Sequence, residues 1–437
     1  MPFMPFSILG MWFRGLLGIV ILGGAIYLLK EWYDECHFVE AVHVDAVNLD
    51  AGSDLNRDGT AVVKAPVAGR RVFRFEPGLN RETGLLAAGL ALLTWAVVGR
   101  FVIQGASNLF TSSSSGTGST SGPSSAQEKH GDAPKEERGG KVHTITRPDG
   151  SILHVECYGP ADAPPIVLTH GWGANSTEWY YIKRNLADRF RLIIWDEPGL
   201  GLSKKPDNND YRIENLAADL DAVLGLAGGR PALLVGHSIG GMIILTLAKA
   251  LPETIARKVS GLLLVHTTYT NPVRTTSMAA LYTAIEKPVI VPLLYLTIAL
   301  WPLVWVMNWM SYINGTAYRS TKKSSFAGTE TSEQVEFVAR LMPQARPDVL
   351  ARGMLGMIGY DATATLSTIG VPVLVVAGDQ DTTTLPEASQ FMAKSVPHGR
   401  LVTLSPAKHM GLIEHHAQFD RLVSEFAASC VPAGTTR

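Results

Sequence analysis

The feature that most constrains this chain is the pentapeptide 236–240, Gly-His-Ser-Ile-Gly, which has the pattern G-x-S-x-G. It follows the apolar run 231–235, which is typical of a buried strand, and precedes a helical pattern that begins near residue 241. A serine between glycines, placed between a strand and a helix, indicates a tight, strained turn that lifts the hydroxyl clear of the backbone. Ser238 is therefore the candidate nucleophile.

A serine hydroxyl is a weak nucleophile at neutral pH, so it needs a positioned base and an acid that orients the base. Two later loops offer such groups, each just after a strand-like run. Asp379 and Asp381 follow the run 373–377, and His409 follows the run 401–404. Loops at the carboxyl ends of parallel strands share one edge of a sheet, where sites form. His409 is the candidate base, and either aspartate is a candidate acid.

The chain from residue 141 onward alternates strand and helix patterns. Short, continuous apolar runs indicate strands buried on both faces, and helical stretches such as 213–227 and 240–251 lie between them. This alternation predicts an α/β fold with a mostly parallel central sheet. The predicted strands are 142–147, 151–157, 166–169, 192–195, 232–235, 261–265, 373–377 and 401–404.

Residues 141–431 resemble the α/β-hydrolase superfamily in the order of these motifs. The superfamily's acid usually stands fourth in a G-x-x-D turn, which implies Asp381, with Asp379 as the alternative. The spacing His409-x4-Glu414 resembles the superfamily's last loop, which implies His409 as the base and no catalytic part for Glu414. The resemblance implies a serine esterase or lipase-like enzyme that needs no cofactor and no metal.

An oxyanion hole is also implied by the resemblance. The turn 170–173, His-Gly-Trp-Gly, follows the predicted strand 166–169 as the superfamily's His-Gly turn follows its third strand. The implied donors are the backbone N–H groups of Trp172 and Ile239. Such fixed dipoles stabilise the developing negative charge without having to reorganise.

Two rival functions share these residues. An acyltransferase would pass the acyl group from the same acyl-enzyme to an alcohol, and His415-x4-Asp420 superficially matches an acyltransferase pattern. A non-catalytic membrane scaffold would keep the fold without the chemistry. The complete order of serine, acid and histidine favours an enzyme.

Residues 1–110 are predicted to anchor the chain in a membrane. The stretch 11–29 is close to the ~20 apolar residues that span a bilayer, and a second apolar stretch covers 84–103. A cleaved signal peptide and a buried soluble helix are the competing interpretations of these stretches. The polar segment 31–83 would join the two spans, and a flexible Gly/Ser-rich and charged linker is expected over 111–140.

Charge gives weak evidence on orientation and on partners. Lys30, Arg70, Arg71, Arg74 and Arg81 lie near the span ends in the loop, which favours a cytoplasmic loop and a non-cytoplasmic hydrolase domain. The chain has 38 Lys and Arg against 39 Asp and Glu, a net charge of -1, so no nucleic-acid partner is expected. The three cysteines have no metal-site spacing.

A helical cap is expected over about 266–372, and its segment 288–318 carries no charged residue. Trp301, Trp305 and Trp309 recur every four residues, so on a helix they share one face and are candidates for substrate binding. Three interpretations remain open: an ordinary cap, a cap that also enters the lipid interface, and a further span. A single span would separate Ser238 from the later site residues. A lipid ester or another apolar acyl compound is the expected substrate.

Overall fold

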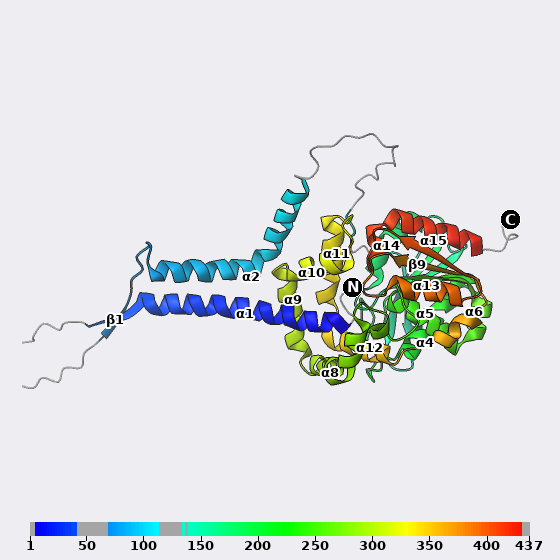
Figure 1. The fold of residues 1–437 in the computed structure, drawn as a ribbon, viewed down its shortest axis with the longest axis horizontal. Helices are drawn as coiled ribbons and strands as arrows, with labels where there is room; N and C mark the ends of the chain where they lie inside the picture. Colours follow the sequence, from blue (N-terminus) through cyan, green and yellow to red (C-terminus); the bar gives the residue numbers. More distant parts are fainter. Residues whose placement is uncertain (1–4, 42–68, 113–132, 136–138, 431–437) are drawn as a thin grey trace, which may run out of the picture. The chain divides into compact units, whose positions relative to one another are not determined.

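The structure is a computed structural model that describes residues 5–41, 69–112, 133–135 and 139–430. These residues form two compact units, drawn in Figure 1. One unit is Leu17–Gly99, and the other combines Met1–Leu16 with Arg100–Arg437. Most of the predicted 111–140 linker and the middle of the predicted 31–83 loop lie outside the described residues.

An eight-stranded sheet forms the centre of the larger unit, in the order β10-β9-β8-β7-β5-β6-β4-β3. The pairs β3–β4 and β4–β6 are antiparallel and all other pairs are parallel, which confirms the predicted mostly parallel sheet. The strands are β3 (Lys141–Thr146), β4 (Ile152–Tyr158), β5 (Pro165–Thr169), β6 (Arg191–Trp195), β7 (Ala232–His237), β8 (Val259–Val265), β9 (Val373–Gly378) and β10 (Gly399–Leu404).

Both faces of the central strands are buried, which explains their continuous apolar runs. In β8, Leu262 and Leu264 join one apolar cluster, whereas Leu263 and Val265 join the cluster on the other face. Helices α4 (Ile213–Leu224) and α5 (Ile239–Ala250) pack in the first cluster, and helices α3 (Tyr180–Leu186) and α15 (His416–Cys430) pack in the second. The remaining helices outside the cap are η1 (Ser176–Trp179), η2 (Gly225–Ala227), α6 (Pro252–Lys258), α13 (Pro386–Ser395) and α14 (Gly411–Glu414).

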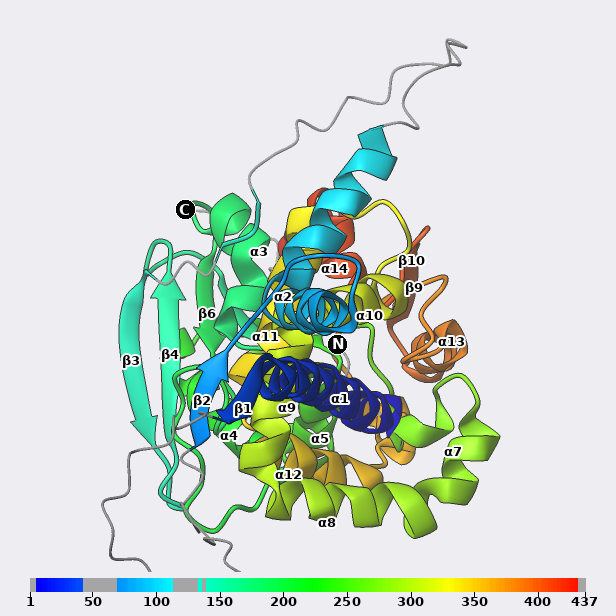
Figure 2. The same cartoon turned by 90° about the vertical axis from the view of Figure 1, so that its left-hand side faces the viewer.

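A helical cap is inserted between β8 and β9, as predicted (Figure 2). Pro302 and Pro347 stand in the first turns of their helices, where a missing N–H costs no hydrogen bond. The cap helices are η3 (Pro272–Arg274), α7 (Ala279–Ile285), η4 (Glu286–Ile290), α8 (Val291–Ala299), α9 (Trp301–Ile313), α10 (Thr316–Ser325), α11 (Ser332–Gln344), α12 (Pro347–Ile358) and η5 (Thr363–Thr368).

The N-terminal region contains two long helices, α1 (Pro5–Cys36) and α2 (Arg81–Ser112), with the paired strands β1 (His37–Ala41) and β2 (Gly69–Phe73) between them. Among the described residues, the helical stretches Gly15–Cys36 and Ala279–Ala299 are long and apolar enough to cross a membrane. The first overlaps the predicted span 11–29. The predicted span 84–103 lies within α2, and its crossing of a membrane stays a prediction.

The first turns of α1 pack with the cap inside the larger unit. The indole N–H of Trp12 donates to the hydroxyl of Thr297 on α8 at 3.0 Å. Gly15 is buried against Met307 on α9, so closely that an added Cβ would overlap the Met307 side chain. The start of α1 therefore belongs structurally to the hydrolase unit.

Candidate active site

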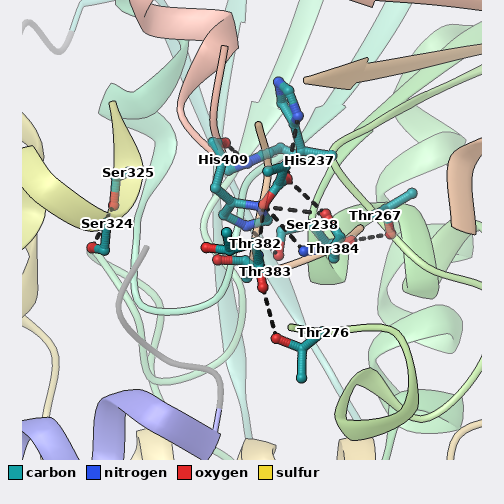
Figure 3. A network of polar contacts seen from close by, with 12 residues as sticks. His237, Ser238, Thr267, Thr276, Ser324, Ser325, Thr382, Thr383, Thr384 and His409 are labelled. Carbon is teal, nitrogen blue, oxygen red and sulfur yellow. Dashed lines mark hydrogen bonds and ion pairs between the residues drawn. The ribbon is translucent and has the colours of Figure 1, made fainter. Parts of the chain in front are cut away.

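Ser238 occupies a strained turn between β7 and α5. Its φ is 53° and its ψ is -117°, a backbone conformation that non-glycine residues rarely adopt. The two glycines of the pentapeptide permit the close packing of this turn. A Cβ at Gly240 would overlap the carbonyl oxygen of Thr169, and a Cβ at Gly236 would overlap the backbone of Gly240. The hydroxyl of Thr267 donates to the Ser238 carbonyl at 2.5 Å and holds the turn (Figure 3).

The structure brings Ser238, His409 and Asp381 together. The Nε2 of His409 lies 3.2 Å from the Oγ of Ser238, and its Nδ1 lies 2.8 Å from an Asp381 carboxylate oxygen. The three residues are 9%, 1% and 2% exposed, respectively. The Asp381 carboxylate also accepts hydrogen bonds from the backbone N–H of Thr383 at 2.8 Å and from the Thr384 hydroxyl at 2.8 Å.

The two candidate acids occupy different places. Asp379 accepts hydrogen bonds from the Ser405 hydroxyl at 2.7 Å and from the Ala407 backbone N–H at 2.8 Å, so it braces the turn after β10. Asp381 is the aspartate that contacts His409. Of the two aspartates that the sequence left as candidate acids, the structure therefore places only Asp381 against His409.

The electrostatics of the pair suit proton transfer from a serine. Burial lowers the pKa of His409 to about 3, despite the opposing effect of the Asp381 carboxylate. Burial alone would raise the pKa of Asp381, but His409 and His266 together hold it well below its usual value. At neutral pH the carboxylate is ionised and the imidazole is neutral. With Nδ1–H directed at Asp381, the free lone pair on Nε2 faces Ser238.

The predicted oxyanion donors lie in two adjoining turns. Trp172 follows β5, and Ile239 is the first residue of α5, where the N–H groups have no partner within the helix. The contact of Gly240 with Thr169 brings the two turns together. His170 has a structural place, since its Nε2 accepts a hydrogen bond from the Glu197 backbone N–H at 3.0 Å.

Sequence reasoning missed a buried network around Glu178 and His237. One Glu178 oxygen accepts a hydrogen bond from the Gly171 N–H at 2.8 Å, and the other lies 2.9 Å from the Nδ1 of His237. The Nε2 of His237 lies 3.2 Å from the His409 carbonyl oxygen. Each ring nitrogen of His237 therefore lies within hydrogen-bond distance of an oxygen, one on the Glu178 carboxylate and one on the His409 backbone. The network ties the oxyanion turn, the nucleophile turn and the His409 loop together.

His266 is a second residue that the sequence did not indicate. It is the first residue after β8, and its Nδ1 lies 3.5 Å from the same Asp381 oxygen that contacts His409. Burial lowers the pKa of His266, so its ring is neutral at neutral pH. Its position directly after a predicted strand could have indicated a site residue, but the sequence around His266 matches no motif.

Hydrogen bonds join the cap to the loops of the candidate site. Glu414 accepts from the backbone N–H groups of Ala327 and Thr329 at 3.0 and 2.9 Å, so it fastens a cap loop to the His409 loop. The Trp172 indole N–H donates to the carbonyl of Leu350 on α12 at 3.0 Å. Gly353 on the same helix abuts the Trp172 ring, where an added Cβ would overlap it.

The three candidate cap tryptophans lie on α9 and contact other cap residues. The Trp305 indole donates to the Pro343 carbonyl at 2.7 Å, and the Arg346 guanidinium lies 4.2 Å from the centre of the Trp301 ring. Trp309 is 38% exposed. Their part in substrate binding stays a prediction.

The chain is similar to known hydrolases over the larger unit. Residues 164–282 match the family profile described as alpha/beta hydrolase fold. A pimeloyl-[acyl-carrier protein] methyl ester esterase of Yersinia pseudotuberculosis is 27% identical over 272 residues, covering 60% of this chain and 92% of the relative. A putative carbamate hydrolase RutD of Pseudomonas savastanoi is 26% identical over 266 residues, covering 61% and 94%.

Solved structures show the same fold. A thermophilic esterase from Thermogutta terrifontis superposes with a TM-score of 0.52 at 23% identity, over 66% of this chain and 99% of the esterase. The eight-stranded sheet, the cap and these similarities lead to one assignment. The larger unit has the α/β-hydrolase fold, and the match over residues 164–282 together with the related hydrolases supports membership of the α/β-hydrolase superfamily.

Proposed function

We propose that this protein is a membrane-anchored serine hydrolase that cleaves a carboxylic ester through Ser238, His409 and Asp381. The observation that carries the proposal is the continuous contact from Asp381 through the two nitrogens of His409 to the Oγ of Ser238, at 2.8 and 3.2 Å. In this arrangement a buried carboxylate orients a neutral imidazole against a serine hydroxyl.

The reaction proceeds through an acyl-enzyme. Ser238 Oγ attacks the ester carbonyl while its proton passes to Nε2 of His409, and the N–H groups of Trp172 and Ile239 hold the oxyanion. His409 then protonates the leaving alcohol as the ester C–O bond breaks. Water attacks the acyl carbonyl and gives its proton to His409, which returns a proton to Ser238 as the acid leaves. Asp381 stabilises the transient imidazolium.

Ester hydrolysis is preferred to the other functions that the sequence left open. The names of the related proteins describe an esterase and a carbamate hydrolase, both of which are hydrolases. His415 and Asp420, the two residues of the acyltransferase-like spacing, contact residues outside the candidate site. His415 lies 2.6 Å from the Pro406 carbonyl oxygen, and Asp420 accepts a hydrogen bond from the Asn185 amide at 2.6 Å.

The packing of the first turns of α1 on the cap constrains how the chain would be anchored in a membrane. Trp12 and Gly15 pack on the cap, so the start of α1 lies on the same side of a membrane as the hydrolase unit. If Gly15–Cys36 crosses the bilayer, the chain must cross again before β3, and α2 is long enough to do so. The two helices then form a hairpin whose loop lies on the opposite side. The basic residues of that loop favour a non-cytoplasmic hydrolase unit.

An apolar acyl group is the proposed substrate moiety. The cap segment 288–318 has no charged residue, and α12 from the same cap packs directly on Trp172 in the oxyanion turn. A cap of this composition favours long acyl chains over short ones, because each buried methylene contributes roughly 0.8 kcal/mol.

Covalent labelling tests the nucleophile. The full-length protein, in detergent, is expected to react with a fluorophosphonate probe at Ser238. Ser238→Ala should abolish labelling and lower ester hydrolysis by at least about 10³-fold. The matched control Ser367→Ala, at an exposed cap residue, should label like wild type. Equal labelling of Ser238→Ala and wild type would refute the assignment.

The pH profile tests the state of the base. The pKa of His409 is lowered by burial from an ordinary value near 6.5, and only the neutral ring accepts the serine proton. Activity should therefore persist at pH 6 and fall only as the pH drops further, when the ring becomes protonated. The measurement is kcat/KM against pH with a soluble ester. An acid limb at or above pH 6.5 is incompatible with a buried neutral base.

The Glu178–His237 pair gives a stability prediction. Glu178→Gln replaces one of the two carboxylate oxygens that contact the Gly171 N–H and His237 with an amide NH2 that cannot accept a hydrogen bond, which is expected to cost about 1–3 kcal/mol of unfolding free energy. It should also lower kcat, because the His409 loop loses its fixed position. Urea unfolding in detergent and steady-state kinetics measure the two effects. Glu425→Gln, on the exposed face of α15, is the control, and equal behaviour of the two variants would count against a stabilising part for the Glu178 contacts.

Chain-length preference tests the substrate class. Aryl esters from acetate to decanoate, each below its micelle-forming concentration, should show kcat/KM rising with acyl length. Equal or higher rates on acetate would contradict an apolar acyl substrate while leaving the Ser238 chemistry intact. Product analysis with an added alcohol separates hydrolysis from acyl transfer.

A further inference from the structure

The cap helices α8 and α9 are apolar on both faces. Their inner side is buried, for example at Leu294 and Val304. Their outer side carries large apolar side chains that remain exposed, and Tyr295 and Val306 are 59% and 55% exposed. We call this outer surface the cap face. It consists of Val289, Tyr295, Leu296, Leu300, Leu303, Val306, Trp309 and Ile313.

The cap face differs from the outer surface of an ordinary soluble cap. A helix that covers a protein core normally turns polar and charged residues toward water. Here the run 288–318 carries no charged residue, and the exposed Lys287 and Arg319 stand directly before and after it. Many large apolar side chains exposed on two successive helices indicate a site of interaction with a protein or a membrane.

Strand pairing excludes a crossing of the membrane by this segment alone. The stretch Ala279–Ala299 is long and apolar enough to span a bilayer. However, β8 precedes the cap and β9 follows it, and the two are neighbours in one sheet, with Leu263 paired to Leu374. A single crossing between them would place two hydrogen-bonded strands on opposite sides. An apolar helix that cannot cross a bilayer can still lie in its interface.

The start of α1 identifies lipid as the partner of the cap face. Trp12 is hydrogen-bonded to Thr297 on α8, and Gly15 packs on Met307 of α9. The candidate span begins at that same residue, Gly15. Tryptophan prefers the headgroup region of a membrane, so α8 and α9 are held at the depth where α1 enters the bilayer. A second copy of the chain would have to displace lipid from this position.

A short path joins the cap face to the candidate active site. Helix α8 packs on α12, and the Leu350 carbonyl of α12 accepts the hydrogen bond from Trp172. At its other end the cap meets the acid loop, where the hydroxyl of Thr276 donates to the Thr382 carbonyl at 2.8 Å (Figure 3). The cap is therefore in contact with both the oxyanion turn and the loop of Asp381.

We propose that the cap face inserts into the interfacial region of the bilayer beside α1, so that the enzyme takes its apolar ester directly from the membrane. The insertion itself rests on the cap and on α1, and the uptake of substrate rests also on the proposed ester hydrolysis. The partner is the apolar boundary of a phospholipid leaflet, recognised by side chains without charge.

Depth measurement tests the insertion independently of activity. Single cysteines replace Val306 or Tyr295 in a full-length chain whose native Cys36, Cys157 and Cys430 are alanine, and each carries an environment-sensitive fluorophore. In phosphatidylcholine vesicles, lipids spin-labelled near the headgroup should quench both positions. A label at Val142, which is 56% exposed on the edge strand β3, should not be quenched. Equal quenching at all three positions, or none at Val306 and Tyr295, overturns the proposal.

Kinetics test the uptake of substrate from the membrane. Leu296→Asp with Val306→Asp places two charges on exposed positions, so folding should persist. Hydrolysis of a long-chain ester dissolved in vesicles should fall at least tenfold, whereas hydrolysis of a soluble acetate ester should stay within twofold of wild type. Leu202→Asp, at a 60% exposed leucine outside the cap, is the control.

The outcomes separate the two proposals. Unchanged vesicle activity in the double variant overturns membrane uptake while ester hydrolysis stands. A wild-type protein that hydrolyses neither ester and takes no fluorophosphonate overturns the proposed function, and the quenching result still decides the insertion.

Discussion

The hydrogen bond between His409 and Asp381 is the contact on which the candidate site depends. It joins the loops after β9 and β10, which are parallel neighbours at one end of the sheet, so both loops emerge at the same edge. The nucleophile turn after β7 emerges at that edge too, because the strands from β7 to β10 all run in one direction. The parallel sheet thus brings together residues that lie more than 140 positions apart in sequence.

Buried polar contacts then hold in place the loops that the sheet brings together. The contacts of Glu178 and His237 connect three turns at the edge of the sheet. A buried Glu178 carboxylate is costly to remove from water, so these contacts contribute position more than net stability. This arrangement explains how a strained turn at Ser238 persists. Contacts from Thr267, Gly240 and His237 all constrain it.

The parts of the site with strict local requirements were predictable from the sequence. A G-x-S-x-G turn needs glycines that no other residue can replace, and the loops with His409 and the acids follow recognisable strands. The choice between Asp379 and Asp381 was not predictable from the residues alone. Both lie in one loop, and their different partners come from separate segments. Glu178 and His266 could not be found because their function arises only from long-range contacts.

The apolar segments were likewise only partly predictable from the sequence. The apolar stretches in α1 and in the cap are visible in the sequence, and composition alone cannot separate a span from a cap. The pairing of β8 with β9 supplies that distinction for the cap, and the Trp12–Thr297 hydrogen bond links the cap to the start of α1. Two apolar stretches of the sequence thus form two different structures: one is a candidate span, and the other is part of a cap with an exposed apolar face.

Trapping the acyl-enzyme is the most direct measurement of the central claim, that Ser238 is acylated through a base held by Asp381. Full-length protein is mixed with an aryl ester, quenched in acid within milliseconds and analysed by peptide mass spectrometry. The account predicts an acyl mass increase on the peptide containing Ser238, strongly reduced in Asp381→Asn and retained in Asp379→Asn. Turnover with no acyl group on that peptide, or equal loss of the adduct in both aspartate variants, would contradict it.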